Sequence, residues 1–107
     1  MDIDVTEAKV ELAGTSVAWC TVRFHEACVH CKIYVYDSKK LWVKMPAILH
    51  KSKKLPLFWF QKKSDSDIAQ AIILKRVFEL TGLDVDMANI ELGKRKLLTL
   101  DPVLTNL

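Results

Sequence analysis

Apolar and polar side chains alternate with a period of two along three successive runs within residues 16–45. Neighbouring side chains on a β-strand point to opposite faces, so each run predicts a strand with one buried and one exposed face. The expected inward residues are Ala18, Cys20, Val22 and Phe24, then Val29, Cys31, Ile33 and Val35, then Leu41, Val43 and Met45. The short links between the runs favour an antiparallel meander.

Two more segments complete the expected β-structure. Residues 8–12 alternate before the turn residues 13–15, and residues 55–60 predict a further strand, buried on both faces or at an interface because it lacks alternation. Helical spacing then begins, with Ser64 as the expected N-cap and Gly82 as the expected stop. The expected inward residues of this helix are Ala69, Ile72, Ile73, Val77 and Leu80.

Together these patterns predict one α+β domain over residues 1–107. Half of the residues are apolar, enough to bury a core. We expect an antiparallel β-sheet of four to five strands, a meander, within residues 1–61, covered on one face by one amphipathic helix over 64–81. Residues 83–107 form a tail that fits a hairpin, a helix or a docked segment.

The sequence offers no catalytic centre that can be assembled from its residues. His25, Cys28, His30 and Cys31 suggest zinc, but residues three apart on a strand point to opposite faces, so Cys28 and Cys31 could not share one ion. The three glycines are scattered and form no phosphate-binding loop, and we expect Asp84-x-Asp86 to be a solvated turn. We therefore expect no enzyme, no metal and no cofactor.

The sequence lacks the patterns typical of membrane proteins and of secreted, disulfide-rich proteins. No apolar run approaches the roughly 18 residues of a membrane span, and the acidic start lacks the pattern of a secretory signal. Three cysteines without framework spacing fit reduced thiols. We expect a cytoplasmic protein with no membrane partner.

Positive charge is concentrated in the middle of the chain. Residues 32–63 hold nine lysines and a single acid, Asp37. Segregated charge attracts polyanions, although clustering on a solvated edge is the simpler alternative. Lys51, Lys53 and Lys54 are expected in a loop that contacts phosphates, followed by Lys62 and Lys63.

The outer sheet face offers a second set of candidates that mixes cations with aromatic rings. Such a face can stack bases, or it can form a subunit interface, and both interpretations stay open. Its residues are Trp19, Arg23, Lys32, Tyr34, Tyr36, Trp42 and Lys44, of which Tyr34, Trp42 and Lys44 are our candidate nucleic-acid contacts.

Val29-His30, Ile33-Tyr34-Val35 and above all Leu41-Trp42-Val43-Lys44-Met45-Pro46 resemble the stage V sporulation protein G (septation protein) family. The order and spacing of the resemblance cover about residues 1–81. That family comprises small bacterial regulators that bind DNA and RNA and form dimers through their sheets. The resemblance implies nucleic-acid contacts at Lys51, Lys53 and Lys54 and at the helix cations Lys75 and Arg76. This chain departs from the family in its lysine-only, shorter basic loop and in Cys31.

We therefore expect a low-specificity DNA- or RNA-binding regulatory protein. The alternative is a protein–protein interaction module that uses the aromatic face without binding nucleic acid. One helix leaves the other sheet face uncovered, so we also expect a homodimer. Its expected interface residues are Leu57, Phe58, Trp59 and Phe60.

Overall fold

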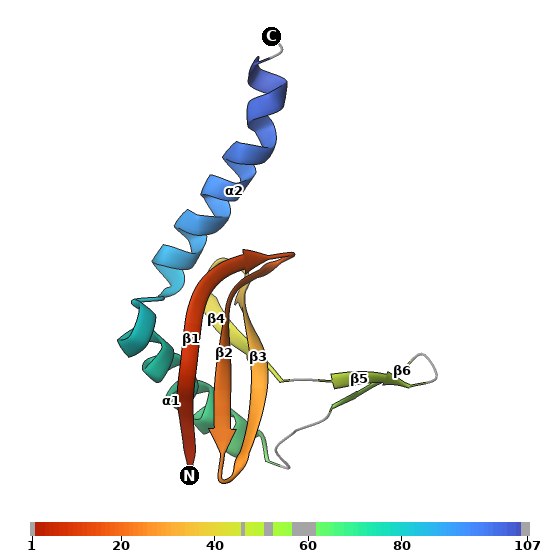
Figure 1. The fold of residues 1–107 in the computed structure, drawn as a ribbon, viewed down its shortest axis with the longest axis vertical. Helices are drawn as coiled ribbons and strands as arrows, with labels where there is room; N and C mark the ends of the chain where they lie inside the picture. The colour runs from red at the N-terminus through yellow and green to blue at the C-terminus, as the bar shows by residue number, and fades with distance from the viewer. Residues whose placement is uncertain (1, 46, 51–52, 57–61, 106–107) are drawn as a thin grey trace.

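A four-stranded antiparallel sheet is the centre of the molecule (Figure 1). The computed structural model describes residues 2–45, 47–50, 53–56 and 62–105, with side chains for 2–45 and 62–95. The strands follow one another in the order of the sequence, as a meander does. They are β1 (Ile3–Ala13), β2 (Ser16–Phe24), β3 (Ala27–Tyr36) and β4 (Lys40–Lys44).

Four further elements follow the sheet. Two short strands pair only with each other, and two helices complete the described chain. These elements are β5 (Ala47–His50), β6 (Lys53–Pro56), α1 (Lys63–Thr81) and α2 (Val85–Thr105). The α+β class and the antiparallel meander are confirmed. Of the fifth strand expected over residues 55–60, Leu55 and Pro56 lie in β6 of the separate β5–β6 hairpin, and residues 57–60 lie outside the described residues. The tail contains a second helix.

The molecule is more extended than a compact domain of the same length. Its radius of gyration is 15.9 Å, whereas a compact domain of this size has about 13 Å. Figure 1 shows why: the β5–β6 hairpin extends to one side of the sheet, and the far half of α2 extends beyond its end. No helix within the described residues is long and apolar enough to cross a membrane.

The alternation in the sequence corresponds to the two faces of the sheet. On β2, Ala18, Cys20, Val22 and Phe24 are buried, as expected, while the residues between them are partly exposed. The helix α1 packs against the inner face, where Ala69, Ile73 and Val77 are buried. Figure 1 shows this helix on one side of the sheet only.

Irregular pairing bends the first strand. Between Val5 and Glu7 the register with β2 shifts, and a second shift lies between Val10 and Ala13. Each shift inserts one extra residue into β1, as a β-bulge does, and a bulge increases local twist and curvature. The curved upper part of β1 is visible in Figure 1.

The helix α1 carries one polar residue into the core. Gln70 is 8% exposed, and its side-chain amide bonds both backbone groups of Val43 on β4. The Val43 N–H donates to Oε1 at 2.9 Å, and Nε2 donates to the Val43 carbonyl at 2.7 Å. Because β4 is an edge strand of the sheet, this side chain takes the place of a neighbouring strand at that residue.

Two expectations about α1 are wrong in detail. Its N-cap position is Lys62, with extended φ and ψ of −108° and 135°, so Ser64 already has helical backbone and cannot cap. At the other end, Gly82 adopts a φ of +76° and its N–H bonds the Phe78 carbonyl, as expected of a glycine stop. Leu80 is nevertheless 45% exposed, whereas Leu83, just after Gly82, is 1% exposed and belongs to the core.

The second helix is attached to one end of the sheet. Asp84 caps it through its Oδ1, which accepts from the Met87 N–H at 2.7 Å, so Asp84 is a helix cap and not the solvated turn we expected. Asn89 donates to the Ser38 carbonyl in the β3–β4 turn. Arg95 donates to the Gly14 carbonyl in the β1–β2 turn. Both tethers reach turns at the same end of the meander.

Candidate nucleic-acid interface

Every second residue pair of β3 and β4 contributes to a surface of lysines and aromatic rings. Alternation places them on the outer face, because Ile33 and Val43 between them are buried inward. We call this set the lysine–aromatic face. Its cross-strand pairs are Lys32 with Lys44, Tyr34 with Trp42, and Tyr36 with Lys40.

The rings of this face are accessible and are contacted by its own lysines. Tyr36 is 60% exposed and Trp42 is 43% exposed, unusual values for large aromatic side chains. The Lys40 ammonium lies 5.2 Å from the Tyr36 ring centroid and 5.7 Å from that of Trp42. The Lys44 ammonium lies 5.7 Å from the Tyr34 centroid. These are cation–π distances, so each of the three rings has a lysine beside it.

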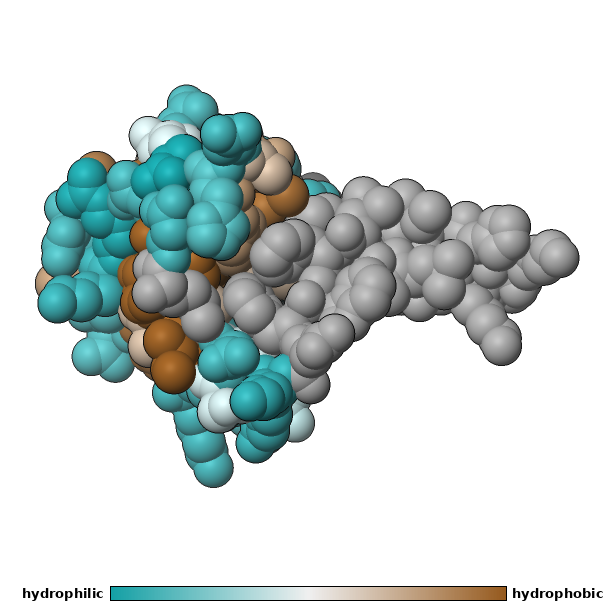
Figure 2. All heavy atoms as spheres, turned by 90° about the horizontal axis from the view of Figure 1, so that it is seen from below, coloured by the Kyte–Doolittle hydropathy of each residue, from teal (hydrophilic) through white to brown (hydrophobic). Residues whose placement is uncertain are grey.

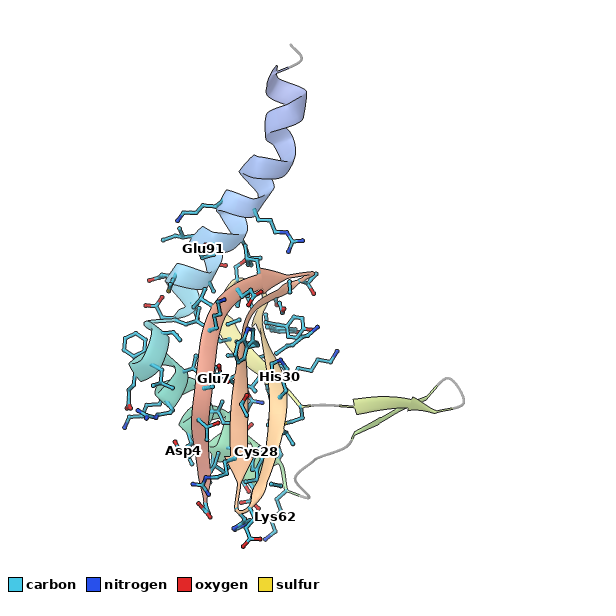
Figure 3. The ribbon with its side chains drawn as sticks, viewed as in Figure 1. Asp4, Glu7, Cys28, His30, Lys62 and Glu91 are labelled. Atoms are coloured by element: carbon cyan, nitrogen blue, oxygen red, sulfur yellow. The ribbon has the colours of Figure 1, made fainter. Side chains whose placement is uncertain are left out.

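The aromatic surface continues onto β2. Trp19 is the direct partner of Lys32, and its ring lies 5.1 Å from that of His30, centroid to centroid. The Trp19 indole N–H donates to Glu11 at 3.0 Å, which fixes the ring. Glu7 and His30 both pair with Thr21, so they lie in one row across the sheet, as Figure 3 shows. The acids Glu7 and Glu11 therefore lie on β1, separated by β2 from the lysines of β3 and β4.

The remaining candidate cations lie elsewhere. Lys62 and Lys63 are exposed at the start of α1, and Figure 3 draws Lys62 toward the end of the sheet opposite α2. Lys75 is exposed on α1, and Arg76 forms ion pairs with Asp4 and Glu79 at 3.6 and 3.2 Å. Because α1 packs on the inner face, Lys75 and Arg76 are not brought together with Tyr34, Trp42 and Lys44.

The expected basic loop and dimer interface are only partly described. Lys53 and Lys54 lie on strand β6, paired with His50 and Leu49, and not in a loop. Lys51 and the four residues Leu57, Phe58, Trp59 and Phe60 lie outside the described residues. The homodimer through those four residues remains a prediction.

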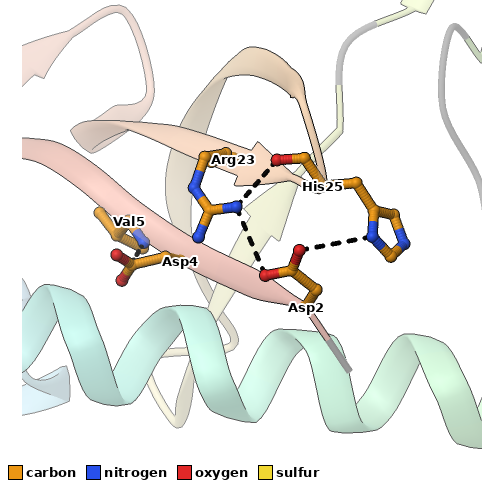
Figure 4. Close-up of polar contacts among 5 residues, drawn as sticks. All are labelled: Asp2, Asp4, Val5, Arg23 and His25. Atoms are coloured by element: carbon orange, nitrogen blue, oxygen red, sulfur yellow. Dashed lines mark hydrogen bonds and ion pairs between the residues drawn. The ribbon is translucent and has the colours of Figure 1, made fainter.

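A polar cluster closes the N-terminal end of the sheet (Figure 4). Asp2 lies 3.4 Å from both Arg23 Nη1 and His25 Nδ1, and Arg23 also donates to the His25 carbonyl at 2.8 Å. His25 has a φ of +54° in the β2–β3 turn. Figure 2, viewed from this end, shows a mostly hydrophilic described surface. The cluster is exposed, with His25 at 81%, so it holds the strand ends and makes no enclosed site.

The cysteines divide between the two faces as the strand pattern predicted. Cys28 is exposed and Cys31 is buried, so their thiols do not converge. Within the described part of the chain, no group of three or more His, Cys, Asp or Glu could hold a metal ion.

Cys20 and Cys31, in contrast, face each other inside the core. They are direct partners on β2 and β3 and are both fully buried. The hydrogen bond between the thiols, together with burial, raises the pKa of Cys20 well above its usual range. Cys31 in turn donates to the Met45 sulfur at 3.9 Å. Cys20 is therefore a neutral thiol at neutral pH.

Comparison with protein-family models, with curated proteins and with solved structures gives no match to this chain. The assignment of a function therefore depends on the residues described above.

Sequence reasoning identified part of this surface and missed part of it. Tyr34, Trp42 and Lys44 were expected on the outer face, and they lie there together. Lys40 was not expected, although it contacts two of the three rings. The signal for Lys40 is its distance from the turn: once Asp37 to Lys39 are assigned to the turn, residue 40 must lie opposite residue 36.

Proposed function

We propose that this protein binds nucleic acid through the lysine–aromatic face. The observation that carries the proposal is the direct cross-strand pairing of Lys32 with Lys44. Like charges directly opposite each other destabilise a strand pair. A bound polyanion reduces the repulsion between the two lysines. The Lys32–Lys44 pair therefore destabilises the free sheet but contributes to binding of a polyanion.

The surroundings support a polyanion as the ligand. Lys40 adds a third cation to the same face, and the acids of the outer face lie across β2 on β1. Lysine offers a flexible point charge without the planar fork of arginine, so its contacts favour phosphates over particular bases. Low sequence specificity follows, which agrees with the regulatory DNA- and RNA-binding role implied by the family resemblance.

The test is the salt dependence of binding to labelled oligonucleotides. Each neutralised phosphate contributes about 0.9 to the log–log slope on duplex DNA and about 0.7 on single strands. Replacing Lys32, Lys40 and Lys44 together with alanine should therefore reduce the slope by roughly 2 to 3. Lys94→Ala is the control, because Lys94 is an exposed lysine on α2 that pairs with Glu91; its slope should equal that of the unaltered protein.

The same assay distinguishes the other candidate contacts. Variants at Lys53 and Lys54, at Lys62 and Lys63, and at Lys75 and Arg76 test the basic segments on the β5–β6 hairpin and on α1. An unchanged slope in the Lys32, Lys40 and Lys44 variant would refute the proposal. Self-association that is insensitive to salt, without any oligonucleotide binding, would favour the protein–protein interaction module instead.

A further inference from the structure

The rings of the lysine–aromatic face are spaced in a way that suits an unstacked strand. Successive outward residues on an antiparallel strand are about 6.8 Å apart, twice the rise of about 3.4 Å per residue. A strand in a DNA duplex also advances about 3.4 Å per nucleotide. The rows of Tyr34 with Trp42 and of Tyr36 with Lys40 are thus two duplex steps apart, so adjacent bases can reach adjacent rows only if they are unstacked.

A duplex has a second difficulty at this face. Its base faces are covered by neighbouring bases, and only base edges and phosphates are presented to a protein. Trp42, at 43% exposure, can offer its ring face to a base once Lys40 moves from it. Ring faces are recognised by bases of any identity when those bases are free of a helix.

We propose that the ligand of this face is single-stranded nucleic acid, whose bases stack on the rings of these two rows, Tyr34 and Trp42 in one and Tyr36 in the other, and displace the lysines that cover them. This inference rests on the proposed function and names its substrate class. In the free protein Lys44 lies over Tyr34 and Lys40 over Trp42. On binding, each ammonium leaves its ring and pairs with a phosphate of the same strand.

The exchange is favourable on the magnitudes of the two contacts. A cation–π contact at an exposed site is worth about 0.5–1 kcal/mol. Stacking of a base on an aromatic side chain is worth about 1–3 kcal/mol. The displaced lysine keeps its charge and can contact a phosphate. The same side-chain movement therefore exposes the ring to the base and brings the ammonium to the phosphate. The lysines keep the ring faces covered until a strand arrives.

The experiment separates ring stacking from charge. Tyr34→Leu and Trp42→Leu keep every lysine and remove one ring each. With a labelled 12-nucleotide oligo(dT) as the probe, each variant should lose about 5- to 150-fold in affinity. The salt slope should stay unchanged, because no phosphate contact is removed. Trp42→Phe should restore most of the affinity, which distinguishes loss of stacking from damage to the sheet.

Two further measurements complete the test. Phe78→Leu is the matched control, since Phe78 is an aromatic residue that is 52% exposed on α1, away from this face; its affinity should not change. A 12-base-pair duplex should bind at least tenfold more weakly than the single strand.

Either of two results would overturn the inference. Duplex binding as tight as single-strand binding would do so, and so would affinities of Tyr34→Leu and Trp42→Leu within twofold of the unaltered protein. If the lysine variants still reduce the salt slope in those cases, nucleic-acid binding stands and only the single-strand assignment falls. If neither probe binds, the proposed function itself is wrong.

Discussion

Replacement of Gln70 by leucine should destabilise the fold far more than its conservative size suggests. Leucine fills a similar volume but leaves the N–H and C=O groups of Val43 without their partners at 2.9 and 2.7 Å. Val43 is 1% exposed, so water does not replace the lost bonds. Each unsatisfied buried group costs about 1–3 kcal/mol, and the added apolar area returns about 1–2 kcal/mol. For the two groups together these figures span about 0–5 kcal/mol, and we expect a net loss of about 2–4 kcal/mol, in the middle of that span.

Equilibrium urea unfolding followed by circular dichroism measures this loss. Ala71→Leu is the control, because Ala71 is an exposed neighbour on the same helix and should change the unfolding free energy by less than about 0.5 kcal/mol. A loss of 2–4 kcal/mol is a large fraction of the about 5–15 kcal/mol typical of a whole domain. A Gln70→Leu value within 0.5 kcal/mol of the control would refute the role of the two bonds.

Gln70→Glu tests the same reasoning through pH. An ionised carboxylate accepts from the Val43 N–H but cannot donate to the Val43 carbonyl, whereas the protonated acid can do both. The folded state therefore raises the pKa of the introduced acid above its unfolded value of about 4.3. A group with a raised folded pKa stabilises below the unfolded pKa and loses that contribution as pH rises. The deficit of this variant relative to the unaltered protein should shrink as pH falls from 7 to 4.

Three other outcomes follow from the described contacts. The folded state raises the pKa of Cys20, so stability should fall as pH rises above the unfolded thiol pKa of about 8.5. Urea unfolding at pH 7 and 9.5 should show a larger loss in the unaltered protein than in Cys20→Val; an equal loss in both would contradict this. Asp84→Ala removes the cap of α2 and should cost about 1 kcal/mol in the same assay, whereas Asp84→Asn should cost little. Gly82→Ala meets no atom within 4 Å but must adopt a φ of +76°, so a loss of about 1–2 kcal/mol in thermal unfolding is expected, and no loss would show that the turn relaxes.

Most of the sheet could be predicted from local sequence patterns. The alternation around Cys20, Cys31 and Val43 depends only on the period of a strand, and burial agrees with it at all three residues. Short connections then fixed the order of the strands. The turn at Asp37 and Ser38, with positive φ at both residues, brings Tyr36 opposite Lys40, a register that follows once residues 37–39 are assigned to the turn.

The role of Gln70 could not be predicted from local patterns, because its partner is distant in the sequence. Gln70 occupies an inward position three residues before Ile73, but its acceptance in the core depends on Val43, 27 residues away in the sequence. Asp84 is a local case, since it caps α2 through Met87 only three residues on, and this role was missed because the tail was not assigned to a helix. The strands β5 and β6 pair with each other and not with the main sheet. A strand pattern in the sequence shows that a segment is extended but not which strand it pairs with, so this separate hairpin was not predicted.

The meander order of the strands has a consequence for how the chain folds as it is synthesised. Each strand pairs with the one made just before it, so the sheet can form by successive hairpins with short loops to close. The helix that covers its apolar face ends only at Thr81, so residues 45–81 must still be made after β4 is complete. At about 5–20 residues per second, that takes roughly 2 to 7 s. During this interval Ile33 and Val43 have no helix over them, and transiently exposed apolar surface of this kind makes a chain prone to aggregation.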